Sequence, residues 1–153
     1  MVHYSPEQLV EALRSFDVEK LCDNNLGEFS QVQAYSLDTS VYYHKILTPM
    51  FIANRDACLY MHCYKNEKGQ TVLVTYSGEH EKVPLVKKNV RSHMALGGYI
   101  MTPLANGRTH VLYQVQIDIK MKLPKVVQDM FNRKHGYKMH YLQEVLDKLN
   151  KKK

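Results

Sequence analysis

The sequence predicts an α+β fold in which a curved antiparallel sheet of about six strands packs on a long C-terminal helix. Three observations lead to this prediction. Residues 110–122 alternate apolar and polar side chains almost without exception, which is the pattern of a long strand with one apolar face. Short turns join several consecutive alternating segments, which favours an antiparallel meander. A long stretch of helical character follows Leu123–Pro124.

The N-terminal segment is predicted to be helical. Ser5 can cap a helix that begins at Pro6, and Gln8 completes a capping box. Apolar residues at helical spacing continue to Phe16, and a short second helix is expected at about 18–22. The polar segment 23–27 then ends the helical region.

From Phe29 onward the pattern has a period of two. Strands are expected at about 29–36, 39–47, 56–65, 70–77, 90–101 and 109–121. Asn66–Gly69 and Asn106–Gly107 are expected to be hairpin turns, whereas 48–54 and 78–88 form longer connections. The last helix is expected over about 124–149. Gly136 costs this helix ~1 kcal/mol relative to alanine and is the expected site of a bend.

Length and composition favour a single domain over residues 1–153, with a basic tail at 150–153. The chain is 44% hydrophobic and 24% charged, which is usual for a globular protein. No apolar run approaches the ~20 residues of a membrane span, and no secretory signal is visible. The three cysteines lack metal-type spacing and fit reduced thiols. We therefore expect a cytoplasmic protein that is peripheral to membranes.

A net charge of +6 and a pI of 9.1 favour anionic partners. Two groups of basic residues carry much of this charge: Lys148, Lys151, Lys152 and Lys153, and Lys82, Lys87, Lys88 and Arg91. We expect them to make transient contact with an anionic membrane surface, although they could equally form a solvated face. Nucleic acid is not expected as a partner, because the aromatic residues that could stack on bases lie mostly at strand positions that look buried.

The sequence contains no motif that indicates catalysis or metal binding. It lacks a His-Glu-x-x-His pattern, a Gly-x-Ser-x-Gly elbow, a P-loop and a glycine-rich dinucleotide loop. His44, His93 and His110 are on separate predicted strands. We therefore expect no catalytic residue, no metal site and no cofactor.

Four landmarks occur in a characteristic order. Arg55–Asp56 opens one strand, Val90–Arg91 opens another, and Val115–Asp118 leads into Leu123–Pro124 and the long helix. In this order, over roughly residues 5–149, the chain resembles the START (StAR-related lipid-transfer) domain family. The resemblance implies a helix-grip fold, in which a curved sheet wraps around the C-terminal helix and a lipid occupies the tunnel between them.

The resemblance also implies a set of lipid-binding residues on the apolar faces of the sheet and the helix. Flexible methionines suit such adaptable walls, and ligand pockets are mostly apolar. The expected wall residues are Met61, Cys63, Met94, Tyr99, Tyr113, Val115 and Ile117 from the sheet, and Val127, Met130 and Phe131 from the helix. The same residues could instead pack against one another as an ordinary core.

The loop of Pro49, Met50, Phe51 and Ile52 matches the family's gating loop, and its apolar tip is expected to cap the tunnel or dip into a bilayer. It could also tuck into the core. Arg91 is a candidate contact for a lipid headgroup, because arginine binds phosphate through two parallel hydrogen bonds. The alternative for the Arg55–Asp56 pair and Arg91 is structural, as an ion pair or a strand-end hydrogen bond.

The chain departs from the family pattern at three points. The helix and three strands that precede the matching segment in the family have no counterpart here, so strand 109–121 is expected to have a bare edge. Pairing of that edge in a homodimer, or its closure by the N-terminal helix, would follow. Cys22 replaces a usual tryptophan. Met61 stands where sterol-binding members place an arginine, which favours a phospholipid or other amphiphile over a sterol.

The first functional hypothesis is therefore a non-enzymatic protein that binds a lipid and transfers it between membranes. One alternative is an interaction module without a cavity that pairs through strand 109–121. Another is a helix-grip enzyme of the polyketide-cyclase type. That alternative would require titratable groups such as Tyr99, Tyr113 or His93 to converge inside the fold.

Overall fold

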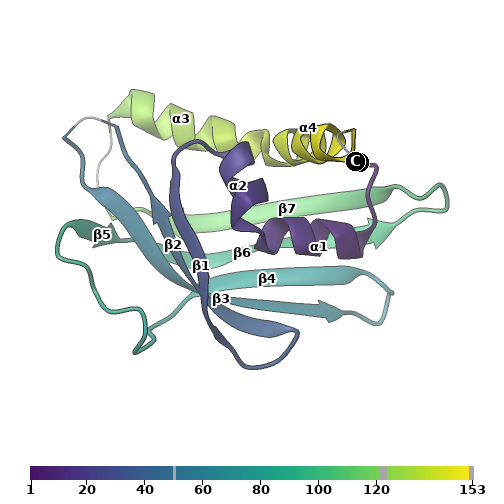
Figure 1. Cartoon of the computed structure of the whole chain (residues 1–153), viewed down its shortest axis with the longest axis horizontal. Coiled ribbons are helices and arrows are strands. Elements are labelled where there is room, and N and C mark those ends of the chain that lie inside the picture. Colours follow the sequence, from purple (N-terminus) through teal and green to yellow (C-terminus); the bar gives the residue numbers. More distant parts are fainter. Residues whose placement is uncertain (50, 121–123, 152–153) are drawn as a thin grey trace.

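The computed structural model describes residues 1–49, 51–120 and 124–151. A bent sheet carries helices along one face, and α3 and α4 lie nearly end to end beside β7 (Figure 1). This is the α+β arrangement of sheet and C-terminal helices that the sequence predicts. The elements in chain order are α1 (Pro6–Arg14), α2 (Phe16–Cys22), β1 (Leu26–Ala34), β2 (Thr39–Ile46), β3 (Asn54–Lys65), β4 (Thr71–Ser77), β5 (Asn89–Arg91), β6 (His93–Pro103), β7 (Thr109–Asp118), α3 (Lys125–Gly136) and α4 (Lys138–Asn150).

The sheet has the strand order β1-β2-β3-β4-β6-β7, and all of these neighbours are antiparallel. The short strand β5 pairs in parallel with the first residues of β3. The prediction of one strand over 90–101 was therefore wrong in this detail. The strand is interrupted at Ser92, between β5 and β6. The backbone N–H and the hydroxyl of Ser92 each donate a 2.8 Å hydrogen bond to the carbonyl of Asp56, so Ser92 is held against β3 before β6 begins.

The two predicted N-terminal helices are present and have the expected caps. The Ser5 hydroxyl accepts from the N–H of Gln8 at 3.3 Å, and the Gln8 side chain accepts from the N–H of Ser5 at 2.9 Å. These bonds satisfy two backbone donors that a helix start leaves without partners. Ser15 caps α2 by accepting from the N–H of Val18.

The predicted single helix over 124–149 is divided into α3 and α4 at Tyr137, directly after Gly136. The interruption of the helix therefore occurs next to the glycine that the sequence singles out. β7 forms an end of the sheet. Val2 pairs with Thr109 through two 2.9 Å backbone hydrogen bonds, and no other described segment pairs with the outer side of β7.

Alternating residues of β1, β2 and β3 divide between two apolar clusters, one on each face of the sheet. The larger cluster lies on the helix side and joins α1, α4 and the inner face of the strands. Its members include Leu9, Leu13, Phe29, Tyr42, Leu59, Met61, Leu73, Met101 and Leu142. A smaller cluster of Val41, Cys58 and Val83 lies on the opposite face.

Candidate functional site

The helix side of the sheet is tightly filled at one end and loosely filled at the other. Beneath α1 and α4, Leu9, Leu73, Met101 and Leu142 have no exposed surface. Beneath α3, the inward-facing residues of β6 and β7 and most apolar residues of α3 keep part of their surface accessible, as Met94, Tyr113, Val115, Met130 and Phe131 show. Apolar side chains that face a covering helix yet stay partly accessible are expected where the two layers do not fill the space between them.

Most of the predicted wall residues lie at this loosely filled end. Met94 and Tyr99 of β6 pack against the edge of the main core, and Val127 of α3 is buried. Ile117, near the end of β7, is 36% exposed. Two predicted wall residues lie elsewhere. Met61 is packed in the main core, and Cys63 lines a groove beside α1.

Polar side chains gather where β6 and β7 meet the junction of α3 and α4. The rings of Tyr99 and Tyr113 stack with centroids 4.7 Å apart, and a 2.8 Å hydrogen bond joins the Tyr113 hydroxyl and Nδ1 of His135. Burial raises the pKa of both tyrosines well above their ordinary value and lowers the pKa of His135. All three side chains are therefore uncharged at pH 7.

Two ion pairs connect α2 to the C-terminal helices next to this group. Lys138 pairs with Glu19, and Lys134 pairs with Asp23. His44 of β2 lies close by and packs edge-on against Phe29. Burial lowers its pKa to about 4, with the charges of Lys138 and His135 acting in the same direction and that of Asp23 opposing them. Burial also raises the pKa of Cys22 to about 11, so this thiol is not reactive at neutral pH.

Sequence reasoning expected Tyr99 and Tyr113 inside the fold but missed the histidines and ion pairs around them. The inward position of His44 could have been predicted, because His44 alternates with Tyr42 and Ile46 on the inward face of its strand. Glu19, Lys138 and His135 had no such pattern, because they lie on α2, α4 and α3 and meet only through the packing of these helices. His93, the third titratable residue suggested by the sequence, is exposed.

The predicted gating loop connects β2 to β3 at the same end of the molecule as the start of α3 (Figure 1). Phe51 is fully exposed at 104% and Pro49 is also exposed, whereas Ile52 is partly buried. Met50 lies outside the described residues. The Thr48 hydroxyl bonds to the carbonyls of Ile52 at 2.7 Å and Ala53 at 2.9 Å, which closes the base of the loop. An exposed phenylalanine therefore projects from a loop with an ordered base.

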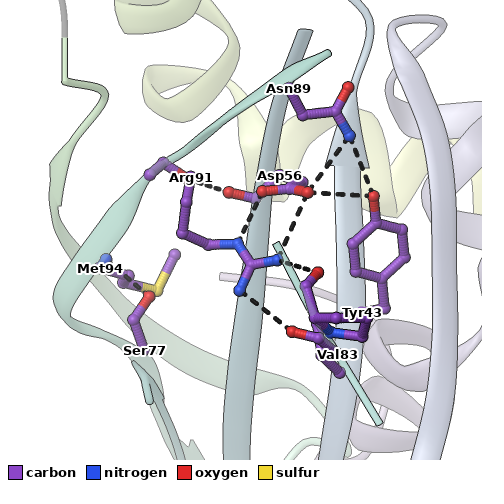
Figure 2. Close-up of polar contacts among 9 residues, drawn as sticks. Tyr43, Asp56, Ser77, Val83, Asn89, Arg91 and Met94 are labelled. Atoms are coloured by element: carbon purple, nitrogen blue, oxygen red, sulfur yellow. Dashed lines mark hydrogen bonds and ion pairs between the residues drawn. The ribbon is translucent and has the colours of Figure 1, made fainter. Parts of the chain in front are cut away.

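Arg91 lies in a polar network on the outer face of the sheet (Figure 2). Its Nε donates to Oδ1 of Asp56 at 2.7 Å, and Oδ2 of Asp56 accepts from Tyr43 and Asn89 at 3.2 Å each. Val83, whose carbonyl accepts from Arg91, belongs to the small outer cluster. The sequence alternative of an ion pair is the arrangement observed. Because Arg91 points away from the helix side, the structure does not support the expected contact with a lipid headgroup between the sheet and the helix.

Arg55 points to the helix side and joins the gating loop to the end of β7. It is 2% exposed, and its guanidinium donates to the carbonyls of Ala53 and Ile119. Burial lowers its pKa. Its role in the described structure is to hold the base of the loop against the segment that follows β7, a strand that is not adjacent to β3 in the sheet.

Among the described residues, two grooves that open to the surface lie outside the loosely filled region. One of about 710 Å³ lies between α1 and the ends of β3 and β4 and includes Arg14 and Cys63. The other, of about 770 Å³, lies beneath the 78–88 loop and includes Arg91 and Lys120. Their lining residues come from neither α3 nor α4, so both grooves are distinct from the loosely filled region. Among the described residues, no group of three or more His, Cys, Asp or Glu side chains is arranged to hold a metal ion.

Comparison with known proteins now identifies the class to which this fold belongs. The sequence model of the START domain matches residues 3–151, and the chain belongs to this family. It is similar to the Arabidopsis thaliana protein ENHANCED DISEASE RESISTANCE 2-like, with 31% identity over 130 residues that cover 78% of this chain and 18% of the relative. It is also similar to human START domain-containing protein 10, with 26% identity over 121 residues, 79% of this chain and 41% of the relative.

Solved structures show the same fold. The crystal structure of human STARD10 superposes with a TM-score of 0.80 at 23% identity, covering 93% of this chain and 58% of that one. Human StAR-related lipid transfer protein 5 superposes with a TM-score of 0.82 at 20% identity, covering 97% and 73%. The chain spans less than half the length of the two curated relatives described above, 18% of one and 41% of the other. Within the described residues, no helix combines the length and apolar character needed to cross a bilayer.

Proposed function

We propose that this chain binds an amphiphilic lipid between the sheet and α3 and transfers it between membranes. The observation that carries the proposal is the change in packing along the helix side, from fully buried side chains under α1 to partly exposed apolar side chains under α3. Apolar surface in water costs ~25 cal/mol per Å², so a lipid chain that covers these residues is held strongly. Membership of the START family and the likeness in fold to human StAR-related lipid transfer protein 5 support the same proposal.

The proposed transfer begins at the end of the molecule that carries the gating loop. Phe51 is free to enter a bilayer, and Lys87 and Lys88 precede β5, which pairs with the first residues of β3 directly after this loop. A lysine near an anionic surface contributes ~1 kcal/mol to binding. We therefore place the protein at the periphery of anionic membranes during lipid exchange. A phospholipid or other amphiphile remains favoured over a sterol because of Met61, which is packed in the core.

The titratable side chains inside the fold favour a binding function over a catalytic one. A general base or a general acid works best when its pKa is near the operating pH. Here burial makes His44 and His135 weaker bases and Tyr99 and Tyr113 weaker acids. These shifts suit hydrogen bonding by neutral groups more than proton transfer.

Lipid extraction and native mass spectrometry of the purified chain test the binding proposal, and vesicle transfer tests the gate. Replacing Phe51 and Ile52 by serine should slow transfer of a fluorescent phospholipid by about tenfold or more, because a buried phenylalanine contributes ~1.5–3 kcal/mol. Leu37→Ser, at a 93% exposed position in the turn between β1 and β2, is the control and should transfer normally. Equal transfer by all three proteins would reject the gate, and absence of bound lipid in every preparation would reject the lipid site.

A second candidate function rests on the outer edge of β7. Apart from Thr109, this edge has no strand partner among the described residues. Backbone groups at a free edge can pair with an added strand, either from a second copy or from another protein. We propose a homodimer as the simplest occupant of this edge, and the Discussion gives its test.

A further inference from the structure

Three separate segments place exposed apolar side chains at one end of the molecule. Phe51 in the gating loop, Leu85 in the loop before β5 and Val126 at the start of α3 are 104%, 78% and 75% exposed. The gating loop, β5 and the start of α3 lie at the same end of the longest axis (Figure 1). Val86, next to Leu85, is also exposed. Single exposed apolar residues are ordinary, whereas a group of them at one end of a molecule indicates an interaction surface.

The pairing of β5 with β3 brings the loop of Leu85 next to the gating loop. These two strands are parallel, and Asn89 at the start of β5 is paired with Asn54 at the start of β3. In a parallel pair, the segments that lead into the two strands lie at the same end of the strands. The segment before Asn54 is the end of the gating loop, and the segment before Asn89 contains Leu85 and Val86. The two loops are therefore neighbours because of the backbone pairing of the sheet.

The loop that carries Leu85 is held on both sides of this residue. Nη2 of Arg91 donates to the carbonyl of Pro84, directly before Leu85, at 3.0 Å. The N–H of Asn89 donates to the carbonyl of Val86, directly after Leu85, at 2.9 Å. The gating loop likewise has a hydrogen-bonded base. A side chain that projects from a fixed backbone loses little conformational freedom on binding, so both loops are prepared for contact.

The charge of these segments is complementary to an anionic surface. Lys87 and Lys88 in the turn before β5 and Lys125 at the start of α3 are exposed. None of the three forms an ion pair within the described part of the chain. Neither segment 83–88 nor segment 124–128 contains an acidic residue. Ammonium groups beside apolar side chains fit the boundary of an anionic bilayer, where the apolar groups reach the acyl chains and the ammonium groups meet lipid phosphates.

We propose that Leu85 and Val86 form a second membrane anchor beside the gating loop, so that the protein docks on an anionic bilayer with this end of its longest axis. The inference rests on the proposed lipid transfer and names the surface that contacts the donor and acceptor membranes. Phe51 and Leu85 enter the acyl region, while Lys87 and Lys88 remain at the phosphates. Two anchors fix the orientation of the molecule, because one inserted side chain leaves it free to tilt. In this orientation the start of α3 faces the bilayer.

Single tryptophan reporters test the proposal, because the chain contains no tryptophan. Leu85→Trp and Phe51→Trp place a reporter in each loop. Leu37→Trp is the control, because Leu37 is exposed in the turn before β2, whereas the gating loop follows the other end of that strand. On vesicles of phosphatidylcholine with phosphatidylserine, the emission of both loop reporters should shift to shorter wavelength and be quenched by phosphatidylcholine brominated on its acyl chains. The emission of the control should stay as in buffer.

Serine and glutamine variants separate the apolar from the ionic contribution. Leu85→Ser with Val86→Ser should weaken binding to the phosphatidylserine vesicles by about tenfold or more, because the apolar side chains no longer enter the acyl region. Lys87→Gln with Lys88→Gln should weaken the same binding by about tenfold or more and leave binding to pure phosphatidylcholine vesicles unchanged. Sedimentation with the vesicles measures both effects.

The matched control removes two exposed leucines from other parts of the surface, Leu37 and Leu112. Leu37→Ser with Leu112→Ser should bind the vesicles as the unmodified protein does. Circular dichroism confirms that every variant is folded.

The outcomes separate the second anchor from the function on which it rests. Quenching of Phe51→Trp without quenching of Leu85→Trp would overturn the second anchor while the gate stands. Equal quenching of Leu37→Trp would overturn docking by this end of the molecule. Equal binding to vesicles with and without phosphatidylserine would overturn the role of the lysines. Absence of any reporter shift together with absence of lipid transfer would overturn the proposed transfer function itself.

Discussion

Replacing Arg91 by methionine should destabilise the protein more than replacing Asp56 by asparagine, although both changes break the same ion pair. The Asp56 side chain is 1% exposed and that of Arg91 is 22% exposed. Without Arg91, a buried carboxylate loses its only cation in the network. With asparagine at 56, the guanidinium still donates to the carbonyls of Val83 and Pro84 and reaches water.

The magnitudes follow from this difference in exposure. Removing one partner of a buried pair costs about 3–5 kcal/mol, and we expect the loss from Arg91→Met to lie in this range. Asp56→Asn removes hydrogen bonds to a charged acceptor, which are worth about 1.5–3 kcal/mol. The total free energy of unfolding of a domain this size is about 5–15 kcal/mol, so either change should shift the urea midpoint clearly.

Urea unfolding followed by circular dichroism measures both variants and the double variant. Lys65→Met is the control, because its ion pair with Glu7 is more than 60% exposed on both sides and should contribute little. The double variant should lose less than the sum of the two single losses, since it leaves no buried charge. An equal loss of stability from Asp56→Asn and Arg91→Met, or a loss no larger than that of Lys65→Met from either change, would contradict this expectation.

Three further outcomes are expected. Gly98→Ala should lower the free energy of unfolding by more than about 2 kcal/mol, because the new methyl carbon would lie 2.4 Å from the carbonyl oxygen of Leu73 and force β4 and β6 apart. Gly136→Ala, whose methyl group meets nothing within 4 Å, should be neutral or stabilising by up to ~1 kcal/mol. Thermal unfolding compares the two variants. Burial lowers the pKa of His44 to about 4 in the folded protein, so the unfolded chain takes up a proton first as the pH drops. The free energy of unfolding should therefore fall by roughly 3 kcal/mol between about pH 6.5 and about pH 4. His44→Phe should flatten this pH dependence, which urea unfolding measures. Pairing of the free β7 edge predicts a dimer in analytical ultracentrifugation at micromolar concentration, and a monomer across the whole concentration range would exclude it.

Local sequence patterns predicted most helices and strands of this fold, because the interactions that form a helix start, a strand or a turn involve residues close together in the chain. Alternation in 110–122 gave the correct inward face of β7, the capping box placed the start of α1, and the residues around Gly136 marked the division between α3 and α4. The break at Ser92 could not be predicted in this way. It depends on hydrogen bonds to Asp56, which is 36 residues away in the chain.

The candidate site was predictable only in part, for the same reason. Alternation and helical spacing identified the apolar residues that face inward, but they did not distinguish Met61, which packs in the core under α1, from Met94, which lies at the loosely filled end. They also did not show that Arg91 faces outward. The sequence by itself determined most of the strands and helices and the family, because those depend on short-range periodicity and ordered landmarks. Tertiary structure alone decided which side chains are tightly packed, and it brought Glu19, His44 and Lys138 together, because burial and charge pairing depend on contacts between segments far apart in the chain.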